Sequence, residues 1–219
     1  MFNALTFDND IMSRPYASRY TAVFHAGETR IDDPKVTNFI TGGAGLRDGD
    51  GIYLPCIMAD DAVIDRAIEG VLGEKRRIII NVCSDLEEVG TCDKRYGATP
   101  VGLAHKYGLL DGAFVCGCSY VDKDDVDLIV QSGARVILTP SLTMGEGKGI
   151  PPLRMLLSLG AEVHIGTGMA EFDPEGDLGF ELRLIGLAVS AALGTKYPID
   201  KNDLKKMLNT PANIVDIRA

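Results

Sequence analysis

The 219-residue sequence lacks the features that mark membrane-spanning and secreted proteins. It has no apolar run of about 18 residues, which a transmembrane helix needs. We therefore predict that the protein neither spans nor binds a membrane. Its first ten residues, MFNALTFDND, contain neither the basic n-region nor the apolar h-region of a signal peptide. We therefore expect a cytoplasmic protein.

Positive charge is scarce. Lysine and arginine number 22 against 31 aspartate and glutamate residues, and the formal net charge is −9. Binding to nucleic acid needs clustered lysine and arginine, and the one compact basic stretch is EKRR at 74–77. We therefore expect no nucleic-acid partner, and we interpret the acidity as a contribution to solubility.

Cysteine is limited to five residues, which is an odd number. An odd set without a secretory signal does not indicate a disulfide framework. We therefore expect all five to be reduced thiols, namely Cys56, Cys83, Cys92, Cys116 and Cys118.

From about residue 51 the sequence alternates between strand-like and helix-like segments. Short apolar runs predict strands at 51–56, 76–83, 112–118, 135–140 and 162–168. Helical spacing of apolar residues predicts helices at 59–74, 97–107, 122–134, 151–160, 177–194 and 200–209. The first 50 residues are less regular, and their candidate strands are 3–8, 20–25 and 35–40.

Strands that alternate with helices and are apolar on both faces indicate a parallel α/β sheet. We expect one compact domain, with irregular strands over 1–50 and a βα-repeat barrel over 51–219. Two architectures fit this pattern, a (β/α) barrel of the TIM type, shortened or distorted, and an open doubly wound sheet. In both, functional residues belong at the C-terminal ends of the strands.

Four of the five cysteines fall at these predicted strand ends. One interpretation is a thiolate site for a soft metal or a reactive thiol. The other is that cysteine is simply a small apolar residue, common in buried strands. Strand alternation gives Cys116 and Cys118 the same direction, so we expect both to face the helices rather than a site.

The three histidines and a glycine-rich loop give weaker signals. His25 and His105 are interpreted as structural or surface residues, and His164 lies inside the last predicted strand without a histidine partner. The loop TMGEGKG at 143–149 lacks the P-loop spacing. It is interpreted as a mobile loop over the strand ends, or as an anion-binding segment before the helix that follows.

The segment from about Gly108 to Ile214 resembles the amidohydrolase superfamily, especially its cytosine-deaminase, guanine-deaminase and chlorohydrolase-like branch. The resemblance rests on GLLDGAFVCGCSYVDKDDVDLIV, on the loop ending in GIPP and on GAEVHIGTG, where the family has a strand ending in Gly-Thr-Asp. INVCSDLEEV at 80–89 and LNTPANIVDI at 208–217 extend it. It implies a TIM-like barrel that lacks some early βα units. Such a barrel is either trimmed or completed by a partner chain.

The family's chemistry does not carry over to these residues. The resemblance implies a His-x-His pair, two further histidines, a glutamate and an aspartate around one or two divalent metals. No His-x-His occurs in the chain, and NFITGGAGLRDG at 38–49 is aligned with the segment that should carry it. The other matching positions hold Asn81, Ser84, Gly117 and Gly168. Zn²⁺ needs about three protein ligands for a catalytic site, so no cofactor is expected.

Three hypotheses follow. The first is a non-catalytic or divergent homologue that binds a small molecule or partner through Asn81, Ser84, Gly117, Ser141 and Gly168. The second is an active hydrolase acting on C–N bonds, with catalytic Cys83, Asp85 and Glu171, or with zinc bound by Cys83, Cys116, Cys118 and His164. The third is a structural subunit of a homo-oligomer, since a barrel lacking strands exposes a sheet edge that invites pairing.

Overall fold

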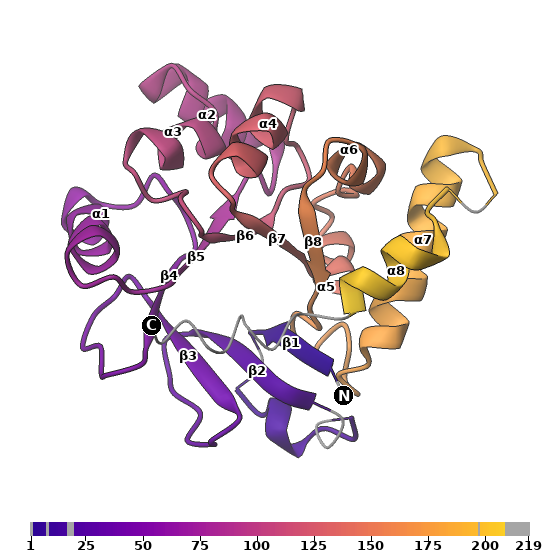
Figure 1. Ribbon diagram of the computed structural model, residues 1–219, viewed down its shortest axis with the longest axis horizontal. Helices are drawn as coiled ribbons and strands as arrows, with labels where there is room; N and C mark the ends of the chain where they lie inside the picture. Colours follow the sequence, from indigo (N-terminus) through magenta and orange to yellow (C-terminus); the bar gives the residue numbers. More distant parts are fainter. Residues whose placement is uncertain (1, 8, 17–19, 197, 209–219) are drawn as a thin grey trace.

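The computed structural model describes residues 2–7, 9–16, 20–196 and 198–208. Eight parallel strands follow one another in sequence order around a ring (Figure 1). They are β1 (Phe2–Thr6), β2 (Tyr20–Gly27), β3 (Val36–Thr41), β4 (Gly51–Leu54), β5 (Ile78–Val82), β6 (Phe114–Gly117), β7 (Arg135–Leu138) and β8 (Glu162–Ile165). This order confirms the TIM-like barrel, and the doubly wound alternative was wrong because such a sheet reverses its strand order.

The two ends of the ring meet through Gly168, just beyond β8. Thr6 forms an isolated parallel bridge with Gly168, and the Phe7 amide donates a 2.8 Å hydrogen bond to the Gly168 carbonyl. The candidate strands of the first 50 residues therefore belong to the same sheet as the βα repeats.

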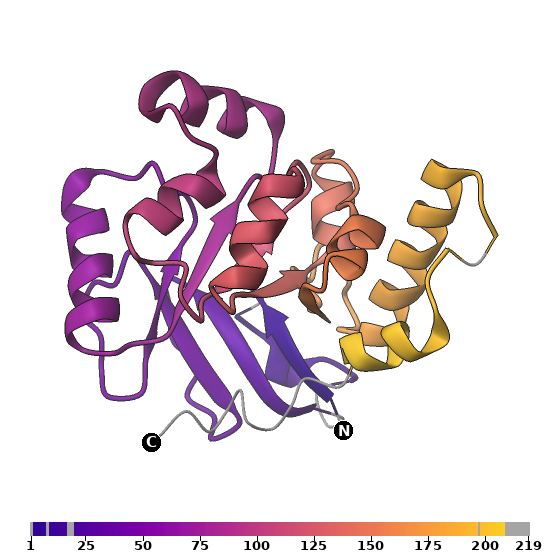
Figure 2. The same ribbon diagram turned by 45° about the horizontal axis from the view of Figure 1, so that its top comes forward.

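The α-helices lie outside the ring, and Figure 2 shows them gathered on the side of β4 to β8. They are α1 (Asp61–Ile68), α2 (Leu86–Tyr96), α3 (Pro100–Lys106), α4 (Lys123–Gln131), α5 (Pro140–Gly145), α6 (Leu153–Ser158), α7 (Leu178–Leu193) and α8 (Lys201–Leu208). A 3₁₀ turn (η1, Ile11–Ser13) follows β1, and a π turn (η3, Glu69–Gly73) extends α1.

The barrel is shortened in its helices rather than in its strands. Among the described residues between β1 and β4, no segment forms an α-helix. The expectation of missing strands was therefore wrong, because the early strands are present without their helices. The open sheet edge that favoured a homo-oligomer no longer supports it, and the oligomer stays a prediction that light scattering can check. LNTPANIVDI lies outside the described residues beyond Leu208.

Two segments differ from the sequence expectation. Residues 86–96 form α2, which was not predicted, and its N-terminus is capped by the Asp85 carboxylate, which accepts a 2.7 Å hydrogen bond from the Glu88 amide. The expected loop after β7 begins instead with α5, which has Pro140 at its first position. The six residues of α5 show too few turns for periodicity analysis.

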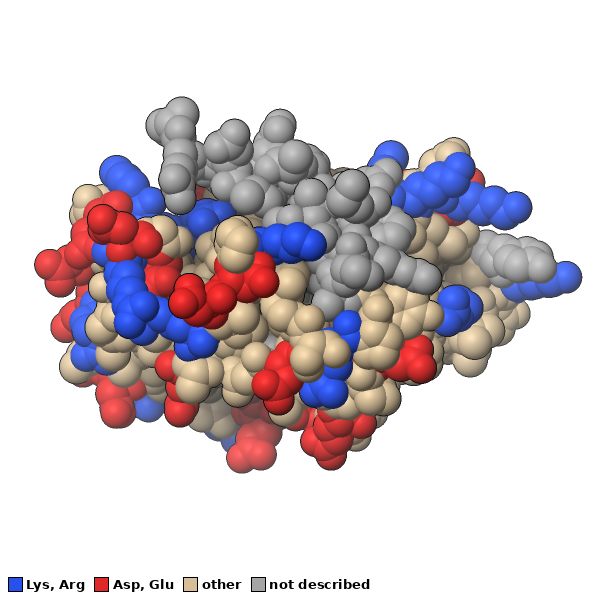
Figure 3. Space-filling model, turned by 90° about the horizontal axis from the view of Figure 1, so that it is seen from below, with Lys and Arg blue, Asp and Glu red and all other residues tan. Residues whose placement is uncertain are grey.

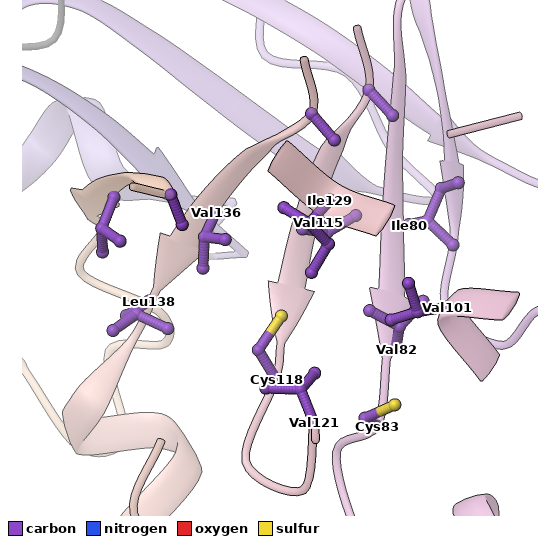
Figure 4. Packing of buried hydrophobic residues seen from close by; sticks show 14 of the residues in the cluster. Ile80, Val82, Cys83, Val101, Val115, Cys118, Val121, Ile129, Val136 and Leu138 are labelled. Atoms are coloured by element: carbon purple, nitrogen blue, oxygen red, sulfur yellow. The ribbon is translucent and has the colours of Figure 1, made fainter. Parts of the chain in front are cut away.

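Two apolar clusters fill the structure, one on each side of the strands. The outer cluster packs the strands against the helices (Figure 4). The inner one holds Phe24, Phe39 and Phe114 with their rings edge-on at centroid distances of 5.3 to 6.3 Å. The Arg77 and Arg135 guanidinium groups lie 5.6 to 5.7 Å from these rings. The N-terminal part of the lumen is thus packed, and the space for a ligand lies at the other end.

Charged side chains of both signs are interspersed on the face that Figure 3 shows. Ion pairs among the described residues include Arg30 with Asp50 at 2.7 Å and Arg76 with Glu74 at 2.5 Å. Within the described part of the chain, no helix combines the length and the apolar character needed to cross a membrane.

Candidate functional site

A cavity of about 200 Å³ opens at the C-terminal ends of the strands. Its walls come from β4 to β6, from the segments that follow β1, β7 and β8, and from α5. The lining residues are Phe7, Tyr53, Asn81, Ser84, Cys116, Gly117, Thr139, Leu142, Thr143, Glu146, Lys148 and Met169. This is the end of a parallel barrel where binding sites are expected.

Asn81 and Ser84 form one wall of this cavity. The Ser84 hydroxyl donates a 2.7 Å hydrogen bond to Asn81 Oδ1, and Asn81 Nδ2 donates one of 3.2 Å to the Pro55 carbonyl. Gly117 from the neighbouring strand lies against this pair. Three of the five predicted binding residues are therefore brought together at the cavity.

Gly117 and Gly168 occupy positions where a side chain has no room. Gly117 has φ +81°, and a Cβ there would lie 2.4 Å from Ser84 Oγ and 2.8 Å from the Val82 carbonyl oxygen. Gly168 has φ +65°, and its Cβ would lie 2.8 Å from Leu142 Cβ. Both conformations favour glycine. Gly168 does not line the cavity but joins β1 to the end of β8.

Ser141 was predicted to bind ligand, but the structure turns it away from the cavity. It is buried against α7, where its amide donates a 2.8 Å hydrogen bond to Glu181 Oε2 and its hydroxyl one of 2.5 Å to Glu181 Oε1. The cause is α5, whose first turn directs the Ser141 side chain toward α7 rather than along an open loop.

The cysteines lie on both sides of the sheet. Cys83 and Cys118 belong to the outer cluster (Figure 4), whereas Cys116 belongs to the inner one and lines the cavity. The expectation that Cys116 and Cys118 face the same way was wrong. The alternation breaks because Gly117 and Cys118 both have positive φ, +81° and +55°. Cys83, Cys116, Cys118 and His164 therefore cannot converge on one zinc ion.

The predicted catalytic residues are not brought together either. Cys83 is fully buried, with its thiol 3.9 Å from Asp125 Oδ2, and burial raises its pKa. Asp85 caps α2, and Glu171 is exposed. His164 is buried with its Nε2 2.9 Å from Glu162 Oε1, and burial lowers its pKa. A thiolate nucleophile needs a base that favours its ionisation. The Asp125 carboxylate beside Cys83 raises the thiol pKa further, and neither residue lines the cavity.

Comparisons with known proteins find similar deaminases, although no family model matches the chain. The 5-methylthioadenosine/S-adenosylhomocysteine deaminase of Desulforamulus reducens is 32% identical over 121 residues, which cover 55% of this chain and 28% of the deaminase. Its counterpart in Caldicellulosiruptor saccharolyticus is 31% identical over 94 residues, which cover 42% of this chain and 22% of the deaminase.

Solved structures share the fold at low sequence identity. A zinc-containing atrazine chlorohydrolase from Arthrobacter aurescens superposes with a TM-score of 0.71 at 15% identity, covering 91% of this chain and 57% of the other. Guanine deaminase from C. acetobutylicum with bound guanine gives 0.64 at 11%, covering 98% and 58%. These matches show that the chain shares the barrel fold of these enzymes. The matched segments are less than a third of the length of the two deaminases above.

Tyr53 lines the cavity and was not found by sequence reasoning. Thr143, Glu146 and Lys148 also line it, and they come from the segment 143–149 that was expected over the strand ends. The charged groups of Glu146 and Lys148 are 2.8 Å apart. The position of Tyr53 two residues after the start of β4, pointing inward, could have been read from strand alternation. The inward reach of Thr143 and Lys148 depends on α5, which periodicity did not reveal.

Glu88 lies behind Ser84 and was also missed. Its Oε2 accepts a 2.7 Å hydrogen bond from the Ser84 amide, whereas its Oε1 is buried without a partner among the described residues. Burial raises its pKa to about 7. The spacing of Asp85 and Glu88, three residues apart at a helix start, is the signal of a capping box and could have marked it.

The thiols are expected to react very unequally in the native amidohydrolase-like fold. Cys56 is partly exposed, whereas the other four cysteines are buried. Burial raises the pKa of all five thiols, so exposure decides which of them reacts. Titration with a thiol reagent should therefore show one fast thiol, and Cys56→Ser should remove it. Several fast thiols in the folded protein would contradict this placement.

Proposed function

We propose that this chain is an amidohydrolase-like protein that has lost the metal-ligand set of its family and binds a small molecule at the C-terminal face of the barrel. Its relatives are deaminases and hydrolases of the amidohydrolase superfamily. What supports the finer proposal is the fit of the backbone around two glycines and the chemistry of the cavity walls.

The glycines carry the proposal. The resemblance aligns Gly117 with a family histidine and Gly168 with the family aspartate. At both positions φ is positive and neighbouring atoms occupy the space of a Cβ. The backbone conformation and the neighbouring atoms at both positions therefore leave no room for a histidine or aspartate side chain. A simple exchange of one metal ligand would have left that room in place.

The donor set at the cavity does not fit a catalytic zinc ion. Its lining offers the Cys116 thiol and the Glu146 carboxylate, and no histidine. Within the described residues, no three His, Cys, Asp or Glu side chains are grouped closely enough to hold a metal. A catalytic zinc ion takes about three protein ligands, and Glu146 is already paired with Lys148.

The cavity chemistry indicates the class of ligand. Hydroxyl and amide groups of Tyr53, Asn81 and Thr139 alternate with the apolar side chains of Leu142 and Met169. Its volume of about 200 Å³ is below the ~300–1,000 Å³ of typical drug-sized sites. A planar heteroaromatic ring of nucleobase size fits this balance, and one structural neighbour holds guanine.

The experiment combines metal analysis with ligand binding. Protein purified without chelators should contain well below one equivalent of zinc, iron or manganese, and calorimetry should detect binding of guanine or adenine. Asn81→Leu should weaken that binding at least tenfold, about 1.4 kcal/mol, while Glu171→Gln, an exposed control, should leave it unchanged. Stoichiometric, tightly held metal, or no binding of any nucleobase, would refute the proposal.

A further inference from the structure

Glu88 is a half-buried carboxylate that follows the Asn81–Ser84 wall in the sequence. It sits on the first turn of α2, where its Oε2 accepts a 2.7 Å hydrogen bond from the Ser84 amide. The Ser84 hydroxyl continues this chain of contacts to Asn81 Oδ1 at 2.7 Å. Glu88 Oε1 is buried and has no hydrogen-bond partner among the described residues. Glu88 does not line the cavity itself, so it can influence a ligand there only through its charge and through Ser84.

The other charges around the cavity largely cancel. Glu146 and Lys148 both line it, and their charged atoms are 2.8 Å apart. Tyr53 and Cys116 are neutral at physiological pH, because burial raises the pKa of both. An ionised Glu88 then leaves the cavity with a net negative charge. In a partly desolvated site one such charge discriminates strongly between ligands of different charge.

We propose that Glu88 determines ligand specificity at this cavity, favouring small planar ligands that carry a positive charge on nitrogen, such as amidines. This inference rests on the proposed function, since it assumes that the cavity binds a small molecule. Glu88 acts as a specificity-determining residue behind Ser84, through the electric field of its carboxylate. No bond is made or broken.

The preference should depend on pH. Burial raises the pKa of Glu88 to about 7, its neighbour Asp85 raises it further, and Lys148 and the Ser84 amide lower it. A group with this pKa is mostly neutral at pH 5.5 and mostly ionised at pH 8.5, so cation binding should strengthen as the pH rises. The other titratable groups influenced by Glu88 are the Tyr53 phenol and the thiols of Cys56, Cys83, Cys92, Cys116 and Cys118.

The test uses benzamidine and benzamide, a cation and a neutral molecule of nearly the same shape. Their dissociation constants are measured by calorimetry or NMR at pH 5.5 and 8.5 on the full chain. For the native protein, benzamidine should bind at least tenfold more tightly than benzamide at pH 8.5, and the ratio should fall several-fold at pH 5.5. Glu88→Gln, which retains an acceptor for the Ser84 amide, should bring the ratio near one at both pH values.

Glu87→Gln is the matched control, because Glu87 is the exposed neighbour on the same helix turn. It removes one formal charge and should leave the benzamidine preference intact. Thermal unfolding of each variant confirms that it folds. Equal loss in both variants, or a preference that persists in Glu88→Gln, would overturn the role of Glu88 while leaving the proposed function standing. Failure of guanine, adenine and both probes to bind would instead refute the proposed function, and this inference with it.

Discussion

Replacing Gly117 with alanine should destabilise the fold by about 3 kcal/mol, the sum of two costs. The first is the left-handed backbone at φ +81°, which is unfavourable for a residue with a Cβ by ~1–2 kcal/mol. The second is overpacking, typically ~1–3 kcal/mol, because the new methyl would lie 2.8 Å from the Val82 carbonyl oxygen. Urea unfolding followed by circular dichroism gives the free energy of unfolding directly.

Gly112 separates these two costs. It has φ +64°, close to the value at Gly117, but nothing lies within 4 Å of a Cβ built there. Gly112→Ala should therefore lose only the backbone cost, about 1 kcal/mol. If both variants lost the same amount, the tight packing of Asn81, Ser84 and Val82 around Gly117 would be wrong.

Removing the Glu181 side chain should lower the free energy of unfolding by a similar amount, because its carboxylate connects α7 to the start of α5 through hydrogen bonds. Glu181 is fully buried and accepts hydrogen bonds from both the amide and the hydroxyl of Ser141. Glu181→Ala leaves two buried donors without partners, and each such group costs ~1–3 kcal/mol. We expect a loss of about 3 kcal/mol in the free energy of unfolding, and a smaller loss for Glu181→Gln, which keeps one oxygen acceptor. Glu171→Ala, at an exposed position nearby in sequence, should stay within ~0.5 kcal/mol of the native value.

Glu181 also gives the fold a pH dependence that Glu181→Gln should reduce. Burial raises its pKa from 4.5 to about 8. Between these values the unfolded chain releases a proton that the folded chain retains, so stability is greatest at low pH and falls as the pH rises toward 8. The contribution of this one group is at most about 1.4 kcal/mol per pH unit. The check is the change in the free energy of unfolding between pH 5 and pH 8, measured for the native protein and for Glu181→Gln. If this change is the same in both proteins, the raised pKa of Glu181 is wrong.

Strand-end reasoning located the cavity because the C-terminal ends of parallel strands always lie at one edge. Asn81, Ser84 and Gly117 could be placed there from the sequence, since each follows or ends a clear apolar run. Ser141 and Cys118 could not, because their directions depend on local backbone conformations that no apolar pattern reports. Glu88 and Tyr53 were missed for a related reason, since a helix start and an inward-facing strand residue carry no family motif.

The sequence by itself determined the alternation of strands and helices from residue 51 onward and the resemblance to the amidohydrolase superfamily. It did so because apolar periodicity and short motifs are local properties of the chain. Only the tertiary structure decided that the first 50 residues complete an eight-stranded ring. It alone also decided that Cys83 and Cys116 face opposite sides of the sheet, and that no side chain fits at Gly117 or Gly168. These outcomes depend on strand pairing, backbone φ angles and the atoms of distant residues, which become neighbours only when the barrel has formed.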